Sequence, residues 1–233
     1  GYHMWEGPYG EWGSRKSIIA SCDQSLKRMG LDYVDIFYHH RPDPDTPLEE
    51  TAEALMQLVR QGKTLYIGIS NYNGEDTKKM SAILREMNAP FIIHQMRYNM
   101  FSRELLEEDL APVLEETGLG AITFSPLAQG LLTKRYLHGI PEDSRAHRKE
   151  IPFLSEDQVT PTLGKIKQLQ DLADLRGQTL AQMALAWNLR QESVTSVLVG
   201  ASRLSQLEES VRMMDNLSFS PEEEQKIEQI LGH

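Results

Sequence analysis

Short apolar runs alternate with longer segments of helical periodicity along the chain, and this alternation constrains the fold more than any other feature. Each run is rich in Ile, Val, Tyr or Phe and is followed by residues typical of loops. The five runs are Tyr33–His40, Thr64–Ser70, Phe91–Met96, Gly120–Pro126 and Ser196–Ser202. Strands alternating with helices are typical of parallel βαβ units, so the chain is predicted to be of the α/β class.

Helical patterns fill the segments between the runs. They cover approximately residues 17–29, 46–61, 74–88, 103–117, 162–175, 179–190, 203–214 and 221–231. The second of these is expected to begin with Thr46 as N-cap and Pro47 at the first helical position, and to stop at Gly62. Ser220 and Pro221 repeat the same start signal before the last helix.

Two architectures fit this order, an open doubly wound sheet and a (β/α)8 barrel. The open dinucleotide-binding sheet normally carries a G-x-G-x-x-G motif after its first strand, and the sequence has none. The barrel is therefore favoured, although it needs eight strands and only five runs are present. The prediction is an α/β (β/α)8 TIM barrel, with residues 1–233 as one barrel domain and about three further βα units expected before Gly1.

Composition excludes several classes of function. The net charge is −10 and the isoelectric point about 5.2, without the basic face expected of a nucleic-acid binder. No apolar stretch is long enough to cross a membrane. The single cysteine, Cys22, and the dispersed histidines argue against a disulfide framework and a metal site. We expect a cytoplasmic protein that binds neither nucleic acid, membrane nor metal.

Polar residues lie at or just after the C-terminal ends of all five runs, where a barrel of parallel strands places its active site. They are His39, His40, Arg41, Ser70, Asn71, Gln95, Ser125, Gln129, Gly200, Ser202 and Arg203. This pattern predicts a polar ring around the mouth of a pocket. His40 is either a hydrogen-bond donor or proton carrier in that pocket, or a buried histidine whose nitrogens the backbone satisfies.

Two further segments are candidates for binding phosphate. The turn Val199–Ser202 precedes a predicted helix beginning near Arg203, and helix N-terminal amides together with this guanidinium could hold an anion. The long insertion Leu131–Asp157 carries Arg135 and Arg145, and is either a binding loop or a solvated surface loop.

Four motifs at these strand ends resemble one protein family. They read YVDIFYHHRPDPDTPLEET, YIGISNYN, FSPLAQGLLT and SVLVGASRLSQLEESV. Together they resemble the aldo-keto reductases, in particular the branch that contains bacterial L-glyceraldehyde 3-phosphate reductases and the β subunits of voltage-gated potassium channels. The resemblance covers nearly the whole chain.

The resemblance implies carbonyl reduction by hydride transfer from NADPH, with a catalytic tetrad of Asp, Tyr, Lys and His. His40 matches the histidine position, where the channel subunits carry Asn, and is expected to orient the carbonyl and stabilise its oxygen. The Asp, Tyr and Lys positions fall before Gly1. A protein without them is expected to have no reductase activity.

The resemblance also implies roles in binding NADPH. Ser70, Asn71 and Gln95 match positions that hold the nicotinamide carboxamide, and Phe124 matches an aromatic ring that stacks on the nicotinamide. The pyrophosphate is expected along Ser125, Pro126, Leu127 and Gln129, with Arg135 and Arg145 as phosphate contacts. The adenosine end is expected at Gly200, Ser202, Arg203, Gln206, Glu209 and Ser210, where the family usually has Asn in place of Ser210. Arg203 would favour NADP over NAD.

Three functions remain compatible with the sequence. The first is a reductase of small aldehydes or ketones, including phosphorylated ones such as glyceraldehyde 3-phosphate, or methylglyoxal. The second is an NADPH-binding regulatory subunit like the channel β subunits. The third is an inactive relative with a scaffolding role. The resemblance further implies a homo-oligomer.

Overall fold

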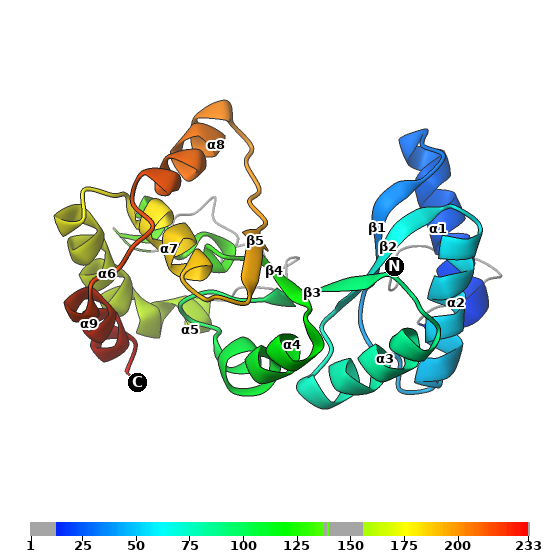
Figure 1. The fold of residues 1–233 in the computed structure, drawn as a ribbon. Helices are drawn as coiled ribbons and strands as arrows, with labels where there is room; N and C mark the ends of the chain where they lie inside the picture. The colour runs from blue at the N-terminus through cyan, green and yellow to red at the C-terminus, as the bar shows by residue number, and fades with distance from the viewer. Residues whose placement is uncertain (1–12, 138, 140–155, 233) are drawn as a thin grey trace. The chain divides into compact units, whose positions relative to one another are not determined.

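The computed structural model describes residues 13–137, 139 and 156–232, and the chain divides into two compact units. The first unit holds residues 1–96 and 104–122, and the second holds 97–103 and 123–233. Each unit is described by itself below, with the element labels of Figure 1.

The first unit contains the earlier strands and the helices that follow them. Its helices are α1 (Arg15–Met29), α2 (Leu48–Arg60), α3 (Gly74–Glu86), the π-helix η1 (Leu105–Leu110) and α4 (Ala111–Thr117). Its strands are β1 (Val34–His39), β2 (Thr64–Ser70) and β3 (Phe91–Arg97), and β4 (Gly120–Phe124) begins in it. Helices α1 and α2 lie together beside β1 and β2 (Figure 1).

The strands pair in chain order, β1-β2-β3-β4-β5, and the β1–β2 and β2–β3 pairs are parallel. His39 is in register with Ile69, and Ser70 is in register with Gln95. Parallel register brings the carboxyl ends of neighbouring strands to the same edge of the sheet. The predicted site residues of the first unit therefore stand side by side.

The core of the first unit lies where α1, α2 and α3 cover these strands. Leu55 and Leu58 of α2 and Ile67 and Ile69 of β2 are fully buried, as is Met80 of α3. Helix α2 turns its charged side chains outward, as expected of an amphipathic helix packed on a sheet.

The second unit contains the remaining elements. They are the 3₁₀ helices η2 (Ala128–Gly130), η3 (Lys134–Tyr136), η5 (Thr160–Thr162) and η6 (Arg212–Asp215), the helices α5 (Glu156–Val159), α6 (Leu163–Leu175), α7 (Leu180–Leu189), α8 (Leu204–Val211) and α9 (Pro221–Leu231), and the strand β5 (Val194–Val197). Helix α7 is buried almost all round, and Trp187 on it stacks on Tyr98 with ring centroids 5.0 Å apart. Both rings are buried, so the stack belongs to the core of the second unit.

Three sequence predictions differ from the structure in detail. Helix α2 begins at Leu48 with Pro47 in the N-cap position, because the Thr46 hydroxyl donates to Asp43 Oδ2 at 2.6 Å instead of capping the helix. Strand β5 begins at Val194, which is buried, whereas Leu198 and its neighbour beyond the strand are about two-fifths exposed.

The third difference lies in the helix predicted at 103–117, which contains a π-helical segment. The Ala111 N–H donates to the carbonyl of Leu106, five residues back, at the end of η1. Pro112 has no N–H and so cannot make the α-helical bond to the Glu108 carbonyl.

The predicted helix signals at two other places are confirmed. Ser220 and Glu223 form a reciprocal capping box at the start of α9, and Gly62, with a φ of 69°, follows the end of α2.

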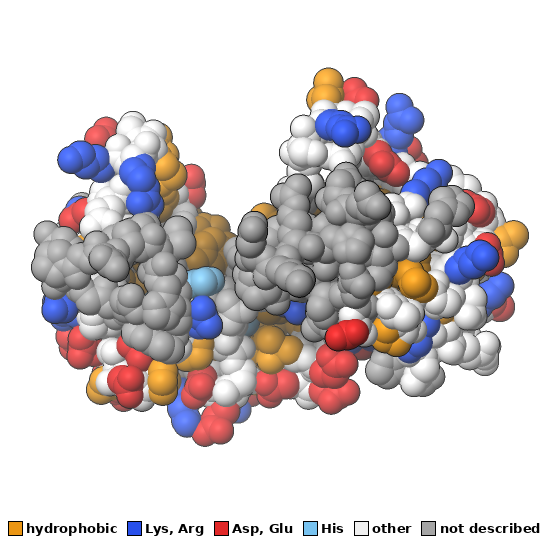
Figure 2. Space-filling view, turned by 180° about the vertical axis from the view of Figure 1, so that it is seen from behind, with side chains coloured by type: hydrophobic (Ala, Val, Ile, Leu, Met, Phe, Trp, Pro, Cys, Tyr) orange, Lys and Arg blue, Asp and Glu red, His pale blue; other side chains and the backbone are white. Residues whose placement is uncertain are grey.

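The remaining expectations on membranes and metals concern the described residues only. None of the helices in that part of the chain has the length and apolarity that a bilayer crossing requires. Within the same residues no group of three or more His, Cys, Asp or Glu side chains gathers as metal ligands would. On the face shown in Figure 2, basic and acidic side chains of the described residues are interspersed.

Candidate active site

The carboxyl ends of β1, β2 and β3 bring four predicted site residues of the first unit together. His40 follows β1, Ser70 ends β2, Asn71 follows it, and Gln95 lies near the end of β3. The Asn71 N–H donates to the Gln95 carbonyl at 3.1 Å. These hydrogen-bonding groups therefore form one polar cluster.

Asn71 is the centre of this cluster. Its side-chain amide donates to the carbonyl of His40 at 2.9 Å and to Ser70 Oγ at 2.9 Å. Its backbone has a φ of 59°, a left-handed conformation that Asn adopts more readily than most residues. This conformation lets one side chain join the end of β1 to the end of β2.

His40 is exposed, as a group that meets a substrate should be. Partial burial, and then the neighbouring Arg41 guanidinium, lower the pKa of its imidazole below the ordinary value of 6.5. His40 is therefore neutral at neutral pH and carries one ring N–H. A neutral imidazole can donate a hydrogen bond to a carbonyl oxygen as negative charge develops on it.

The end of β4 supplies the predicted site residues of the second unit. Asn99 Nδ2 donates to the Ser125 carbonyl at 3.0 Å, and Gln129 Nε2 donates to Ser125 Oγ at 3.2 Å. Pro126 is buried, whereas Phe124 and Leu127 are half-buried and keep part of their surface available. The loop is thus a tight turn with hydroxyl and amide groups near its surface.

The N-terminus of α8 is the second predicted site in this unit. Gln206 Oε1 accepts hydrogen bonds from the backbone N–H of Ser202 at 2.9 Å and of Arg203 at 3.2 Å. Gly200, Ser202 and Arg203 are exposed. A guanidinium at an exposed helix N-terminus is a favourable place for a phosphate.

Other predicted residues stand near these two turns or outside the described part of the chain. The Ser210 hydroxyl donates to the Gln206 carbonyl at 2.8 Å, and the Glu209 carbonyl accepts from Gln182 Nε2 at 3.0 Å. Arg135 is exposed on η3. Arg145 lies outside the described residues, and its predicted phosphate contact stays a prediction.

A buried network behind His40 was only partly foreseen from the sequence. His39 Nδ1 lies 2.6 Å from the Tyr72 hydroxyl, and both side chains are buried. Asp43 accepts from the Gly13 N–H at 2.8 Å and from the Thr46 hydroxyl. His39 was singled out as a strand-end residue, but nothing in the sequence pairs it with Tyr72, since their contact depends on the β1–β2 register.

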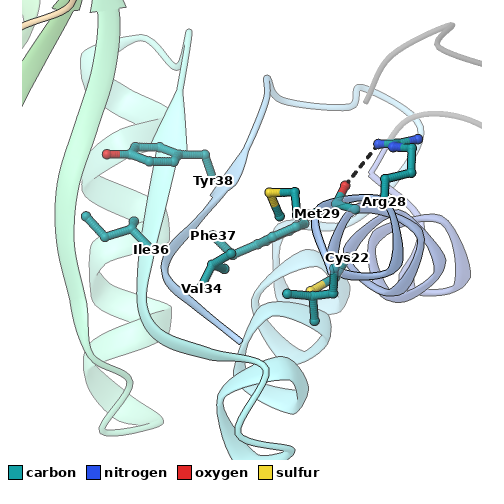
Figure 3. A pocket seen from close by; sticks show the side chains of 9 residues that line it. Cys22, Arg28, Met29, Val34, Ile36, Phe37 and Tyr38 are labelled. Carbon is teal, nitrogen blue, oxygen red and sulfur yellow. Dashed lines mark hydrogen bonds between the residues drawn. The ribbon is translucent and has the colours of Figure 1, made fainter. Parts of the chain in front are cut away.

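A hollow of about 360 Å³ lies elsewhere in the first unit, between α1 and β1 (Figure 3). Apolar side chains dominate its lining, including Leu26, Met29 and Phe37. Burial raises the pKa of Cys22, at its edge, to about 11, so this thiol stays protonated and is a poor nucleophile. None of the predicted site residues lines this hollow.

Comparison with known proteins identifies the family. The sequence model of the Aldo/keto reductase family matches residues 3–231. The chain belongs to this family. The predicted fold class, a (β/α)8 barrel of aldo-keto reductase type, is confirmed by this membership and by the parallel sheet with its helices.

Curated members of the aldo/keto reductase family align over nearly the whole chain. An L-glyceraldehyde 3-phosphate reductase of Escherichia coli O157:H7 is 54% identical over 232 residues, which are 98% of this chain and 67% of that protein. The protein of the same name from Escherichia coli strain K12 is 53% identical over the same shares. A protein of Arabidopsis thaliana, named "Probable voltage-gated potassium channel subunit beta", is 38% identical over 97% of this chain and 70% of its own length. The family makes this chain an oxidoreductase, and the channel subunits are its more distant relatives.

The side chains present suit the nicotinamide dinucleotide that the family generally uses. A carboxamide needs both donors and acceptors, and Ser70, Asn71 and Gln95 offer both. A pyrophosphate or ribose phosphate needs N–H groups and cations, which the α8 N-terminus and Arg203 supply. Groups suited to a carboxamide and groups suited to phosphates are therefore both present among the described residues.

Proposed function

We propose that this chain carries the carbonyl-orienting and cofactor-binding residues of an NADPH-dependent reductase of small aldehydes, phosphorylated ones included. The observation that carries the proposal is the bond from Asn71 Nδ2 to the His40 carbonyl. It ties the predicted carbonyl donor to residues suited to a nicotinamide carboxamide. The high identity to proteins named L-glyceraldehyde 3-phosphate reductase supports the phosphorylated substrate.

One set of residues binds and orients the nicotinamide of the cofactor. NADPH supplies the hydride when it is bound. Ser70, Asn71 and Gln95 hold the carboxamide and so fix the orientation of the nicotinamide ring. Phe124 covers the ring and keeps water away from the reacting carbon.

His40 acts on the substrate. Its neutral imidazole donates a hydrogen bond to the aldehyde oxygen, which orients the carbonyl and stabilises the charge that develops as hydride arrives. The proton that completes the alcohol is assigned to no group of this chain.

The phosphates of the cofactor are assigned to the turn after β4 and to the N-terminus of α8. We assign Ser125, Pro126, Leu127, Gln129 and Arg135 to the pyrophosphate, and the contact of Arg145, which lies outside the described residues, stays a prediction. Gly200, Ser202, Arg203, Gln206, Glu209 and Ser210 hold the adenosine end. The Ser210 hydroxyl is bonded to its own helix, so we assign it a packing contact with adenine rather than a hydrogen bond.

The substitution His40→Ala tests the catalytic assignment. In the full-length gene product we expect kcat to fall by roughly 10²-fold, the usual cost of losing one oxyanion donor, while the Kd of NADPH changes little. Steady-state kinetics with glyceraldehyde 3-phosphate and a fluorescence titration with NADPH measure the two quantities. Asp35→Ala, an exposed change on the same strand, is the matched control. Equal losses in kcat and NADPH affinity would count against the assigned role.

An NADPH-binding regulatory subunit is the second candidate, supported by the 38% identity to a channel subunit β. It predicts tight NADPH binding with turnover near zero for every aldehyde. We further propose a cytoplasmic homo-oligomer, for which light scattering on the purified protein is the direct check.

A further inference from the structure

Two residues that neighbour the proposed site in sequence form a buried link between β1 and β2. His39 directly precedes His40, and Tyr72 directly follows Asn71. His39 Nδ1 lies 2.6 Å from the Tyr72 hydroxyl, and the two rings meet edge to face with centroids 5.8 Å apart. Tyr72 is 0% exposed and His39 6% exposed, so this hydrogen bond is shielded from water.

A second link lies beside the first, one residue after His39 and one residue before Tyr72. Asn71 Nδ2 donates to the His40 carbonyl at 2.9 Å. Strand β1 is thus joined to β2 by a side-chain pair and by a side-chain-to-backbone bond at consecutive residues. A shift of either strand end would break the buried His39–Tyr72 hydrogen bond, whose groups water cannot readily reach.

The ring of His39 is also confined on its other edge. A Cβ added to Gly13 would lie 3.1 Å from His39 Nε2 and 3.0 Å from the Asp43 Cβ, so the glycine backbone fits closely against both. The Gly13 N–H donates to Asp43 Oδ2 at 2.8 Å, and the carboxylate also accepts from the Asp45 N–H and the Thr46 hydroxyl. The residues after β1 therefore form a fixed wall around the imidazole.

His39 keeps one protonation state through the neutral range. Burial lowers the pKa of its imidazole to about 4, which outweighs the opposing effect of Asp43. The same burial raises the pKa of the Tyr72 phenol. Both groups are neutral at working pH, and their hydrogen bond is constant rather than switched.

We propose that His39 and Tyr72 are positioning residues of the reductase: their hydrogen bond holds the ends of β1 and β2 so that His40 faces the carbonyl and Asn71 faces the nicotinamide. Neither touches substrate or cofactor, and both act through the residue beside them in sequence. The proposal rests on the roles proposed above for His40 and Asn71.

Tyr72→Phe is the sharpest test because it removes one hydroxyl and leaves the packed ring. Misplacing a reacting group by a fraction of an ångström is costly, and we expect kcat to fall roughly tenfold while the Kd of NADPH changes less than about threefold. In a His40→Ala background the same change should lower kcat by clearly less than tenfold, because one of the two residues that the link positions is already gone.

Matched variants separate positioning from general damage to the fold. Tyr66→Phe removes a phenol from an exposed position of β2, the strand that precedes Tyr72, and should leave kcat unchanged. His39→Asn keeps an amide near the place of Nδ1 and should recover more of kcat than His39→Leu. Thermal unfolding of each variant shows whether it is folded at the assay temperature.

A readout independent of turnover completes the test. In protein labelled with ¹⁵N histidine, Tyr72→Phe should move the imidazole signals of His40 in the absence of cofactor, and Tyr66→Phe should not. Unchanged His40 signals, or losses from Tyr72→Phe and His40→Ala that multiply in the double variant, would overturn the proposal. A wild-type protein that reduces no aldehyde would overturn the proposed function instead, and the His40 signals would still decide whether the link positions this residue.

Discussion

Four residues of the proposed site and its adjoining turns have a left-handed backbone conformation, which is strained for residues other than glycine. Asn71, Ser125, Ala128 and Gln129 all have φ between 47° and 60°, a region that favours glycine. Such conformations cost about 1–3 kcal/mol each in non-glycine residues and persist where the surrounding structure holds them. Their position directly after β2 and β4 agrees with the binding roles proposed for these turns.

Two buried histidines make stability depend on pH. Burial lowers the pKa of both His39 and His94 to about 4, from 6.5. Between these values the unfolded chain binds more protons than the native one, so the unfolding free energy falls as the pH drops from about 6.5 to about 4. Each histidine contributes up to about 3 kcal/mol to this loss. His94→Met should flatten the slope in this window, measured by denaturant unfolding at several pH values, and an unchanged slope would contradict the assignment.

The Arg203 guanidinium is expected to select the cofactor. Arg203→Ala should weaken NADPH binding by roughly 10- to 100-fold, the scale of a charge-assisted contact to phosphate, and NADH binding much less. Fluorescence titrations with both cofactors measure the ratio. Arg212→Ala, further along the same segment, is the control, and a uniform loss for NADPH and NADH would remove the assignment to the 2′-phosphate.

At the scale of elements, one buried arginine joins the end of α6 to the loop before α9 in the second unit. Arg176 follows α6, and its side chain is 1% exposed. Its guanidinium donates to Glu223 of α9 at 2.6 Å and to the Ser218 carbonyl at 3.0 Å, and lies 3.8 Å above the Phe219 ring. One side chain therefore fixes the loop that leads into α9.

Removing this arginine should destabilise the second unit. Arg176→Met leaves the partly buried Glu223 carboxylate and the Ser218 carbonyl without their donor, and we expect a loss of about 3 kcal/mol in unfolding free energy. The exposed change Arg212→Met should stay within about 0.5 kcal/mol. Chemical denaturation of both variants checks this, and equal values for the two would show that the buried network contributes little.

The sequence was informative about elements where a local signal decides the structure. Apolar runs located the first four strands, whereas the fifth run overlaps β5 only at Ser196 and Val197; Ser220 with Glu223 located the start of α9. It failed where another side chain competes for a capping group, or where the partner of a side chain lies far away in the sequence. Asp43 binds the Thr46 hydroxyl that should have capped α2, and the Tyr72 partner of His39 depends on strand register.

For the molecule as a whole, the family assignment and the site chemistry point to one activity. The chain carries a net charge of −10, which opposes anionic ligands at long range. The proposed binding of a phosphorylated aldehyde and of NADPH therefore requires local groups such as Arg203 and the α8 N-terminus. Which of the remaining site residues touch the cofactor stays a prediction from the resemblance, because no pattern in the sequence fixes their contacts.

The most direct test is to follow the near-ultraviolet absorbance of NADPH when glyceraldehyde 3-phosphate is added to the full-length gene product. The account predicts oxidation of NADPH in step with formation of the alcohol, at a rate that falls roughly 10²-fold in His40→Ala. NADPH that binds tightly but is not oxidised by this or any other small aldehyde would contradict it.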